Sequence, residues 1–141
     1  MRSLRSYWTP SATFTPRHTF QYLASPYTNF PEGMDAAYDA AGKAEALLVL
    51  SGVRVFCPIV YGHSLAKHLP PMSHDWWLQW CRPFMDAAAG IIVLQLPEWE
   101  HSRGVFQERE TFRKHRKPIR YLGWPQTAES LADSMRHWAS V

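Results

Sequence analysis

The run from Gly90 to Leu96 constrains the fold more than any other part of the chain. Its sequence, Gly-Ile-Ile-Val-Leu-Gln-Leu, is short, almost entirely apolar and rich in β-branched side chains. Such a run predicts a strand that is buried on both faces. Strands of this kind are typical of parallel sheets whose two faces are covered by helices. We therefore expect an α/β protein.

Alternating signals for strands and helices surround this run. Further strands are expected at 18–24, 53–60 and 118–122, and helices at 35–50, 76–89, 105–116 and 127–139. The segment 62–73 is predicted to be a loop, and Pro83 is predicted to break the second helix because proline cannot donate a backbone hydrogen bond. Each crossover is long enough for a right-handed βαβ unit, so the sheet should be parallel. The expected fold is a three-layer, Rossmann-like or flavodoxin-like domain with four to five parallel strands.

Length and composition limit the domain organisation. A chain of 141 residues forms one domain with a single core. Residues 1–17 contain Arg2 and Arg5 but no apolar stretch after them, which indicates a loosely ordered leader rather than a secretory signal. Residues 18–141 are expected to form the single α/β domain.

Charge and cysteine content exclude several classes of partner. The net charge of +3 and the isoelectric point near 9.0 suit a small anionic molecule but are too weak to indicate nucleic-acid binding. No apolar run approaches the roughly 20 residues of a membrane span, so no membrane partner is expected. Cys57 and Cys81 have neither CxxC nor zinc-ligand spacing. We therefore expect no metal and a reduced, cytoplasmic protein.

The segment Ser102-Arg103-Gly104-Val105-Phe106-Gln107-Glu108 follows the buried strand and opens a charged helix. Loops at the carboxyl edge of a parallel sheet commonly form binding sites. Glu108 is expected in the first helical turn, where the helix dipole favours an ionised carboxylate. Ser102 and the backbone N–H groups around Gly104 are expected to form a small anion pocket. The same residues equally suit an ordinary N-cap serine followed by a solvated glutamate.

Several motifs, in this order along one chain, resemble the nucleoside 2-deoxyribosyltransferase-like superfamily. Tyr22-Leu23-Ala24-Ser25-Pro26-Tyr27 looks like its opening motif, and Ser102-x-Gly104-Val105-x-x-Glu108 is similar to the active-site motif of its nucleoside 5'-monophosphate N-glycosidase branch. Small bacterial and phage members share further segments, which here are Cys57-Pro58-Ile59 with His63, Asp75-Trp76, and Trp99 to Val105. The resemblance covers residues 18–122.

The resemblance implies a role for Glu108 as the nucleophile that attacks C1' of the sugar through an oxocarbenium-like transition state. A second acid is then needed to protonate the leaving base. Asp75 and Asp86 are the candidates, and we favour Asp75 because it lies among tryptophans at a helix start. The spacing from Glu108 that the resemblance implies for this acid falls near Cys81 and Arg82 instead.

Other residues are expected around the same site. Tyr27 is predicted to hydrogen-bond Glu108 and hold its rotamer, although simple packing also explains a tyrosine there. The expected substrate-binding residues are Ser25, Pro26, His63, Trp76, Ser102, Arg103 and Gly104. The resemblance implies a 5'-phosphate beside Ser102, since its transferases carry an acidic residue near this position and a carboxylate would repel a phosphate.

The expected function is hydrolysis of the N-glycosidic bond of a nucleoside 5'-monophosphate, without a cofactor. Two alternatives stay open: a nucleoside 2-deoxyribosyltransferase that exchanges bases, and a nucleotide-binding domain without catalytic activity. The resemblance also implies a homodimer or homotetramer. We expect the tryptophan-rich segment from Trp76 to Trp80 to form part of that interface.

Overall fold

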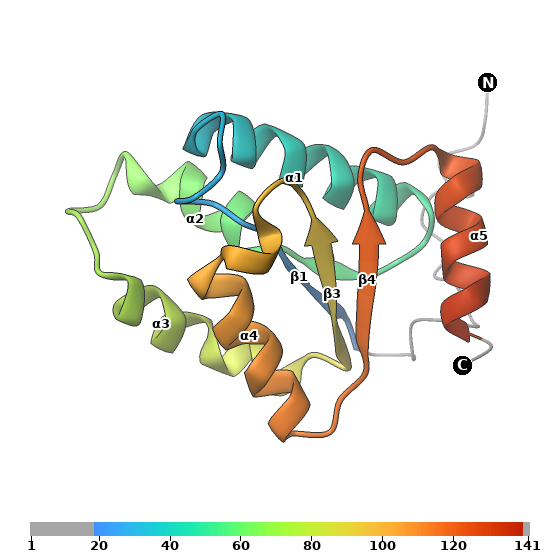
Figure 1. Ribbon diagram of the computed structural model, residues 1–141. Helices are drawn as coiled ribbons and strands as arrows, with labels where there is room; N and C mark the ends of the chain where they lie inside the picture. Colours follow the sequence, from blue (N-terminus) through green and yellow to red (C-terminus); the bar gives the residue numbers. More distant parts are fainter. Residues whose placement is uncertain (1–18, 140–141) are drawn as a thin grey trace.

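The computed structural model describes residues 19–139, so the predicted leader at 1–17 lies outside the described residues. Four parallel strands form one sheet in the order β2-β1-β3-β4 (Figure 1). The strands are β1 (Gln21–Ala24), β2 (Val55–Phe56), β3 (Gly90–Gln95) and β4 (Ile119–Gly123). The central pair is in register from Gln21 opposite Gly90 to Ala24 opposite Val93. The predicted α/β fold with a parallel sheet is confirmed.

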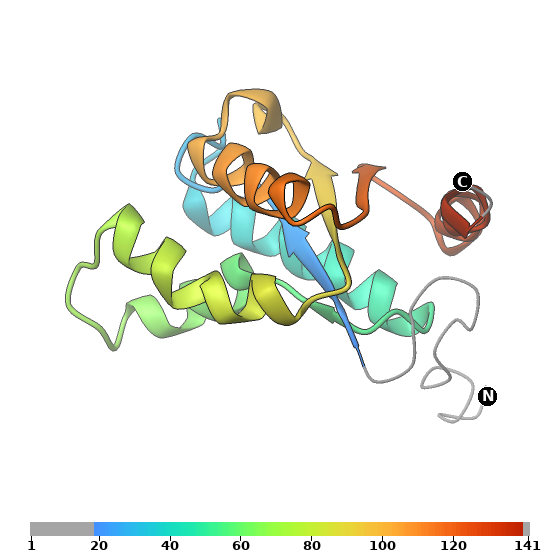
Figure 2. The ribbon, with the colours of Figure 1, turned by 90° about the horizontal axis from the view of Figure 1, so that it is seen from below.

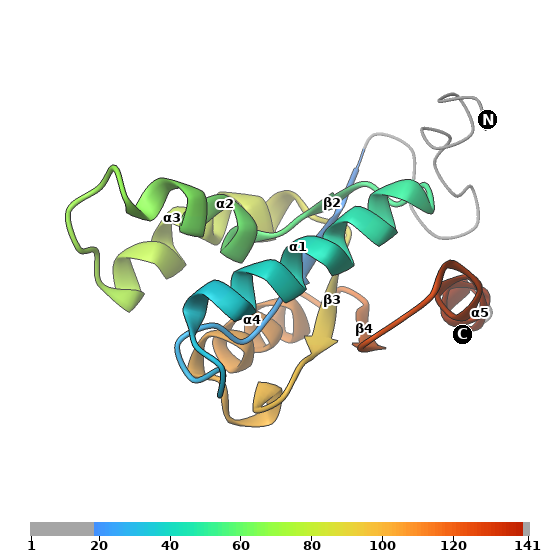
Figure 3. The same cartoon turned by 90° about the horizontal axis from the view of Figure 1, so that it is seen from above.

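Helices cover both faces of the sheet and complete the three layers (Figures 2 and 3). Their bounds are α1 (Met34–Leu50), α2 (Pro58–Ala66), α3 (His74–Ala87), α4 (Arg103–Lys114) and α5 (Ala128–Ala139), with a short 3₁₀ helix η2 (Trp99–His101). Helices α1 and α5 pack on one face, and α3 and α4 pack on the other. Among the described residues, no helix combines the length and apolarity that crossing a membrane requires.

The run that predicted the buried strand is β3, and both of its faces are covered. Ile92 and Leu94 contact the α1 and α5 side, while Ile91 and Val93 contact the α3 and α4 side. All four are fully buried. Gly90 begins the strand where a Cβ would lie 2.8 Å from the carbonyl oxygen of Pro118. Only glycine allows β4 to approach β3 this closely.

Two sequence predictions in the middle of the chain are wrong. Residues Pro58–Ala66 form helix α2, so the predicted strand shortens to the two residues of β2 and the predicted loop begins later. Pro58 occupies the start of the helix, where its fixed φ is favourable and its missing N–H needs no partner. Helix α3 continues through Pro83 without a break, because Pro83 is exposed while Cys81 and Met85 pack into the core.

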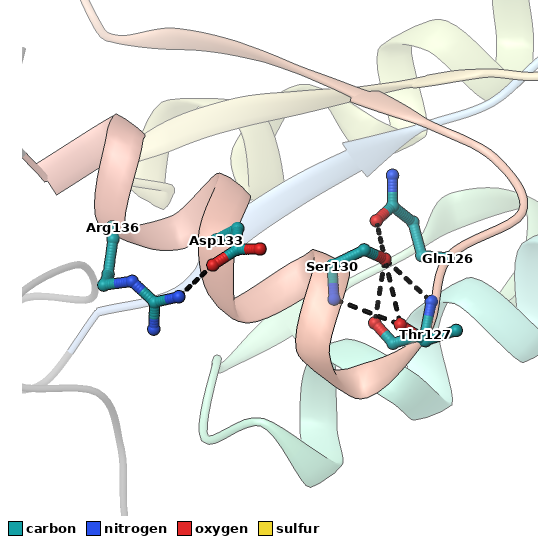
Figure 4. A network of polar contacts seen from close by, with 5 residues as sticks. All are labelled: Gln126, Thr127, Ser130, Asp133 and Arg136. Atoms are coloured by element: carbon teal, nitrogen blue, oxygen red, sulfur yellow. Dashed lines mark hydrogen bonds and ion pairs between the residues drawn. The ribbon is translucent and has the colours of Figure 1, made fainter.

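Helix α5 lies beside β4, at the end of the molecule away from α2 and α3 (Figure 1). Its start is fixed by a reciprocal cap, in which the backbone N–H of Ser130 donates to Thr127 Oγ1 at 3.1 Å and that of Thr127 donates to Ser130 Oγ at 2.8 Å. The Ser130 hydroxyl also donates to Gln126 Oε1 at 2.5 Å, and Arg136 pairs with Asp133 one turn along (Figure 4). These contacts satisfy donors that a helix start otherwise leaves unpaired.

The strand order creates a switch point between β1 and β3, since the chain leaves β1 toward one edge of the sheet and β3 toward the other. The loops after these strands flank a crevice at the carboxyl edge, which is where open α/β sheets bind ligands. Asn29, in the loop after β1, donates its amide hydrogen to the carbonyl oxygen of Glu98 at 3.0 Å. Because Glu98 lies in the loop after β3, this hydrogen bond fixes the two loops to each other.

Candidate active site

A cavity of about 390 Å³ opens at this edge of the sheet. Its wall is built from the loop after β1, the first residue of α1, helix α2, the segment 69–72 and the helices α3 and α4. The titratable side chains on the wall are Tyr27, His63, His74, Cys81 and Glu108, and most of the remaining wall is apolar. A concave, largely apolar space with a few convergent polar groups is the usual form of a small-molecule site.

Glu108 projects from the second turn of α4, because the helix starts at Arg103 with Ser102 as its N-cap. The expectation that it lies in the first turn is therefore wrong. The Tyr22 hydroxyl donates a hydrogen bond to Glu108 Oε2. Burial raises the pKa of Glu108 to about 7, although the hydrogen bond from Tyr22 acts in the opposite direction. Desolvation, rather than the helix dipole, thus decides the charge of this carboxyl group.

Tyr22 is the hydrogen-bond partner of Glu108, a contact that the sequence motifs did not predict. It is fully buried in β1, and its ring packs against Phe112 of α4 at 5.5 Å between centroids. Burial raises the pKa of Tyr22 well above 10, and the nearby Glu108 raises it further. The hydroxyl therefore stays protonated and donates a hydrogen bond to Glu108. The hydrogen bond to Glu108 that was expected from Tyr27 is therefore made by Tyr22. The alternation of side chains along β1 is the sequence feature that could have predicted this contact, because Tyr22 and Ala24 lie on the face of the sheet that α4 covers.

Tyr27 belongs to a second set of polar contacts. Its hydroxyl oxygen lies 2.6 Å from His63 Nδ1, and His63 Nε2 lies 3.0 Å from Asp35 Oδ1. The ring of Tyr38 stacks on His63 with 4.3 Å between centroids and 18° between planes. Burial, and then the charge of Asp35, raises the pKa of Tyr27. The structure therefore brings Tyr27 and His63 to the same cavity as Glu108, as expected, but pairs them with each other.

Neither predicted aspartate reaches the cavity wall. Asp75 is exposed at the start of α3 and pairs with the exposed Arg103 at 3.4 Å. Its neighbour His74 points to the cavity instead, with Nε2 2.5 Å from Gln107 Oε1. Asp86 is also exposed and lies near the far end of α3, 3.8 Å from His115. The expected role of Asp75 as the acid therefore has no support from its position.

Cys81 lies at the position in the sequence where the resemblance implies the second acid, counted by its spacing from Glu108. Its thiol lies on the cavity wall beside the Tyr22 hydroxyl. Burial, and then the negative charge of Glu108, raises the pKa of Cys81 to about 11, so it is a thiol at neutral pH. Cys57 is the other free cysteine, and it is buried in the core.

The predicted phosphate pocket is only partly on the cavity wall. Gly104 lines the cavity, within the first turn of α4. Ser102 is buried behind it and accepts a hydrogen bond from the backbone N–H of Val105 at 3.3 Å, as an ordinary N-cap does. Arg103 is turned outward to Asp75.

The remaining predicted residues are not part of the cavity wall. Ser25 and Pro26 are buried at the end of β1, and neither is part of the wall. Trp76 is more than a third exposed, and its neighbour Trp77 lines the cavity instead. Across residues 19–139, no cluster of three or more histidine, cysteine, aspartate or glutamate residues is arranged to hold a metal ion.

Comparisons with known proteins give a family but no activity. No curated protein matches the chain. One family model, described as a domain of unknown function (DUF1937), matches residues 19–123. This range runs from just before β1 to the end of β4 and contains every residue of the cavity wall. The chain therefore belongs to the DUF1937 family.

Proposed function

We propose that this domain hydrolyses the N-glycosidic bond of a nucleoside 5'-monophosphate, with Glu108 as the nucleophile at C1' of the sugar. The observation that carries the proposal is the place of Glu108 on the cavity wall, hydrogen-bonded to Tyr22. A carboxylate in such a place stabilises an oxocarbenium-like transition state or captures it as a glycosyl–enzyme intermediate. Water then releases the sugar phosphate, and the reaction needs no cofactor.

The environment of Glu108 suits a nucleophile. The hydroxyl of Tyr22 fixes Oε2, so Oε1 is the oxygen that would attack C1'. A pKa of about 7 leaves a large share of the carboxyl groups ionised at neutral pH. Burial also removes part of the water shell that weakens a carboxylate in solution. Tyr22 is accordingly a positioning residue that acts through Glu108.

The 5'-phosphate is proposed to bind at the first turn of α4. Backbone N–H groups at a helix start lack acceptors within the helix, and the dipole there attracts an anion. Gly104 brings this turn to the cavity wall, and a Cβ built on it would lie 3.6 Å from the ring of His74. Ser102 contributes indirectly in this proposal, since its cap fixes the geometry of the turn.

The base is proposed to bind among the apolar wall residues, which include Trp77, Pro58 and Ile59, and Trp77 offers it a flat aromatic surface. A homodimer or homotetramer is part of the same proposal. Light scattering coupled to size-exclusion chromatography measures this assembly directly.

The decisive experiment is incubation with a panel of ribo- and deoxyribonucleoside 5'-monophosphates, with free base measured by chromatography. We expect base release by the wild-type protein and a loss of about three orders of magnitude or more in Glu108→Gln. The matched control is Glu110→Gln, which changes a glutamate of the same helix that is paired with Arg113 and lies outside the cavity wall. Mass spectrometry after reaction with a 2'-fluorinated substrate should find the sugar phosphate attached to Glu108.

Other outcomes identify the alternatives. Base exchange that requires an added acceptor base indicates a 2-deoxyribosyltransferase. Nucleotide binding without turnover indicates a binding domain that lacks catalysis. Equal affinity for a nucleoside and its monophosphate contradicts the phosphate site at α4, whereas absence of both binding and turnover contradicts the whole proposal.

A further inference from the structure

We propose that Tyr27 is the general acid that protonates the leaving base, and that His63 and Asp35 position it and restore its proton. This inference rests on the proposed function, because cleavage of an N-glycosidic bond needs an acid in addition to the nucleophile. The two aspartates expected in this role, Asp75 and Asp86, are exposed and away from the cavity wall. The acid must therefore come from another group on the wall.

The geometry is a chain of hydrogen bonds that runs from the protein surface to the cavity. Asp35 on α1 is almost fully exposed and lies 3.0 Å from His63 Nε2. His63 on α2 is mostly buried, and its Nδ1 lies 2.6 Å from the hydroxyl oxygen of Tyr27. Tyr27 and His63 both line the cavity, and the stacked ring of Tyr38 fixes the plane of the imidazole. Residues from the loop after β1, from α1 and from α2 thus form one chain of contacts that ends at the Tyr27 hydroxyl.

The direction of the chain suits proton donation into the cavity. The proposed step starts with a hydrogen on both ring nitrogens of His63, and the carboxylate of Asp35 accepts the hydrogen bond from Nε2–H. In that form Nδ1–H donates to the Tyr27 oxygen, so the hydroxyl proton of Tyr27 has to point elsewhere. The raised pKa of Tyr27 keeps this proton on the oxygen at neutral pH until an acceptor arrives.

The proposed step balances without a further reactant. An oxygen of Glu108 forms a bond to C1', and the bond from C1' to the base nitrogen breaks, with its electron pair going to the base. The base takes the Tyr27 hydroxyl proton, and the Tyr27 oxygen takes the proton from His63 Nδ1. Water then attacks C1' and breaks its bond to Glu108, and the proton that this water loses returns through Tyr27 to His63.

His74 and Cys81 are the competing proton donors on the wall. The ring of His74 lies at Gly104, where the 5'-phosphate is proposed to bind, and its Nε2 is 2.5 Å from Gln107 Oε1. The position of Cys81 argues against it as well. Its thiol lies beside the pair formed by Tyr22 and Glu108, so it belongs to the side from which the nucleophile attacks. The leaving base departs on the opposite side of C1'. Tyr27 pairs with His63 rather than with the nucleophile.

The test compares two substrates that differ in their need for an acid. The base of 2'-deoxyguanosine 5'-monophosphate leaves with a negative charge unless it is protonated. The base of the 7-methyl derivative already carries a positive charge and leaves as a neutral molecule without a proton. A variant that lacks only the acid should therefore fail on the first substrate and work on the second.

We expect Tyr27→Phe to lower kcat/KM for the unmethylated nucleotide by about a hundredfold or more, and for the methylated one by less than about threefold. His63→Gln should show the same selectivity. Asp35→Asn should have a selective effect of less than about tenfold, since its ion pair is exposed. The matched control is Tyr61→Phe, which removes a tyrosine hydroxyl from α2 outside the cavity wall and should change neither rate.

Equal losses on both substrates in Tyr27→Phe would overturn the proposal, because they indicate a structural effect. Unchanged rates on both would overturn it as well, since another group must then be the acid. Glu108→Gln separates these failures from that of the proposed function, because losing the nucleophile should abolish turnover of both nucleotides. If the wild-type protein releases base from neither of these nucleotides and from no other member of the panel, the proposed function fails and the role of Tyr27 fails with it.

Discussion

Replacing Glu108 by glutamine should stabilise the folded protein at alkaline pH and leave its stability nearly unchanged at acidic pH. Burial raises the pKa of this carboxyl group from the ordinary value of 4.5 to about 7. Between these two values the folded protein holds a proton that the unfolded chain has lost, so the free energy of unfolding of the wild type falls as the pH rises. Above about pH 7 both states are ionised and the loss is complete.

The two pKa values give the size of the effect. Each tenfold change in the acid constant corresponds to 1.36 kcal/mol, so the interval from 4.5 to about 7 amounts to about 3 kcal/mol. Glutamine has nearly the same shape, stays neutral and can still accept the hydrogen bond from Tyr22 through its carbonyl oxygen. Glu108→Gln should thus escape the whole loss, and its melting temperature at pH 8.5 should exceed that of the wild type by on the order of 10 °C.

Urea unfolding of both proteins at intervals from pH 4 to pH 8.5 measures the difference directly. Glu110→Gln is the control on the same helix, because a hydrogen bond and ion pair with Arg113 lower the pKa of Glu110, and its removal should give no gain at high pH. A difference between wild type and Glu108→Gln that stays constant with pH would refute the reasoning. Greater stability of the wild type at pH 8.5 would refute it as well.

Two further predictions concern neighbouring contacts. Tyr22→Phe removes the hydrogen bond that lowers the pKa of Glu108. Such a bond to a charged group contributes about 1.5–3 kcal/mol, so the pKa of Glu108, measured by an NMR titration, should rise by about one to two units. Gly90→Ala places a Cβ 2.8 Å from the carbonyl oxygen of Pro118 and 2.9 Å from Gln21 Oε1. We therefore expect the free energy of unfolding, measured by chemical denaturation, to fall by about 1–3 kcal/mol. The control is Gly42→Ala, where a Cβ meets no atom within 4 Å, and it should not lower this free energy.

Local sequence patterns predicted the layers of the fold, because each strand or helix depends on residues that lie close together in the chain. The uninterrupted apolar run became β3, and the cap at Ser102 and the strand before it located the start of α4 closely. The pattern failed at Pro58–Ala66, where the apolar residues Ile59 and Val60 come shortly after β2. A short apolar run fits a strand and a buried helix equally well, and the proline at its start favours the helix.

The contacts of the site were harder to predict because they join distant residues. Tyr27 meets His63 across 36 positions of sequence, and Tyr22 meets Glu108 across 86. The motifs predicted that Tyr27, His63 and Glu108 would lie at one site, because each comes in the loop or helix after a parallel strand. All three line the same cavity. The motifs did not determine which tyrosine hydrogen-bonds Glu108. A motif gives the residue types at an edge of the sheet, but it does not say on which face of the sheet each side chain lies.

The choice between Tyr22 and Tyr27 as the partner of Glu108 depends on strand order. A right-handed crossover from β1 to β2 on one side, and from β3 to β4 on the other, places α1 and α4 on opposite faces of the sheet. Within β1 only the side chains that alternate toward α4 can then reach its buried surface, and Tyr22 is one of these. Tyr27 lies beyond the strand, on the side of α2, where His63 is its neighbour. The sheet order β2-β1-β3-β4 thus places one tyrosine against Glu108, the proposed nucleophile, and leaves the other available as the proposed acid.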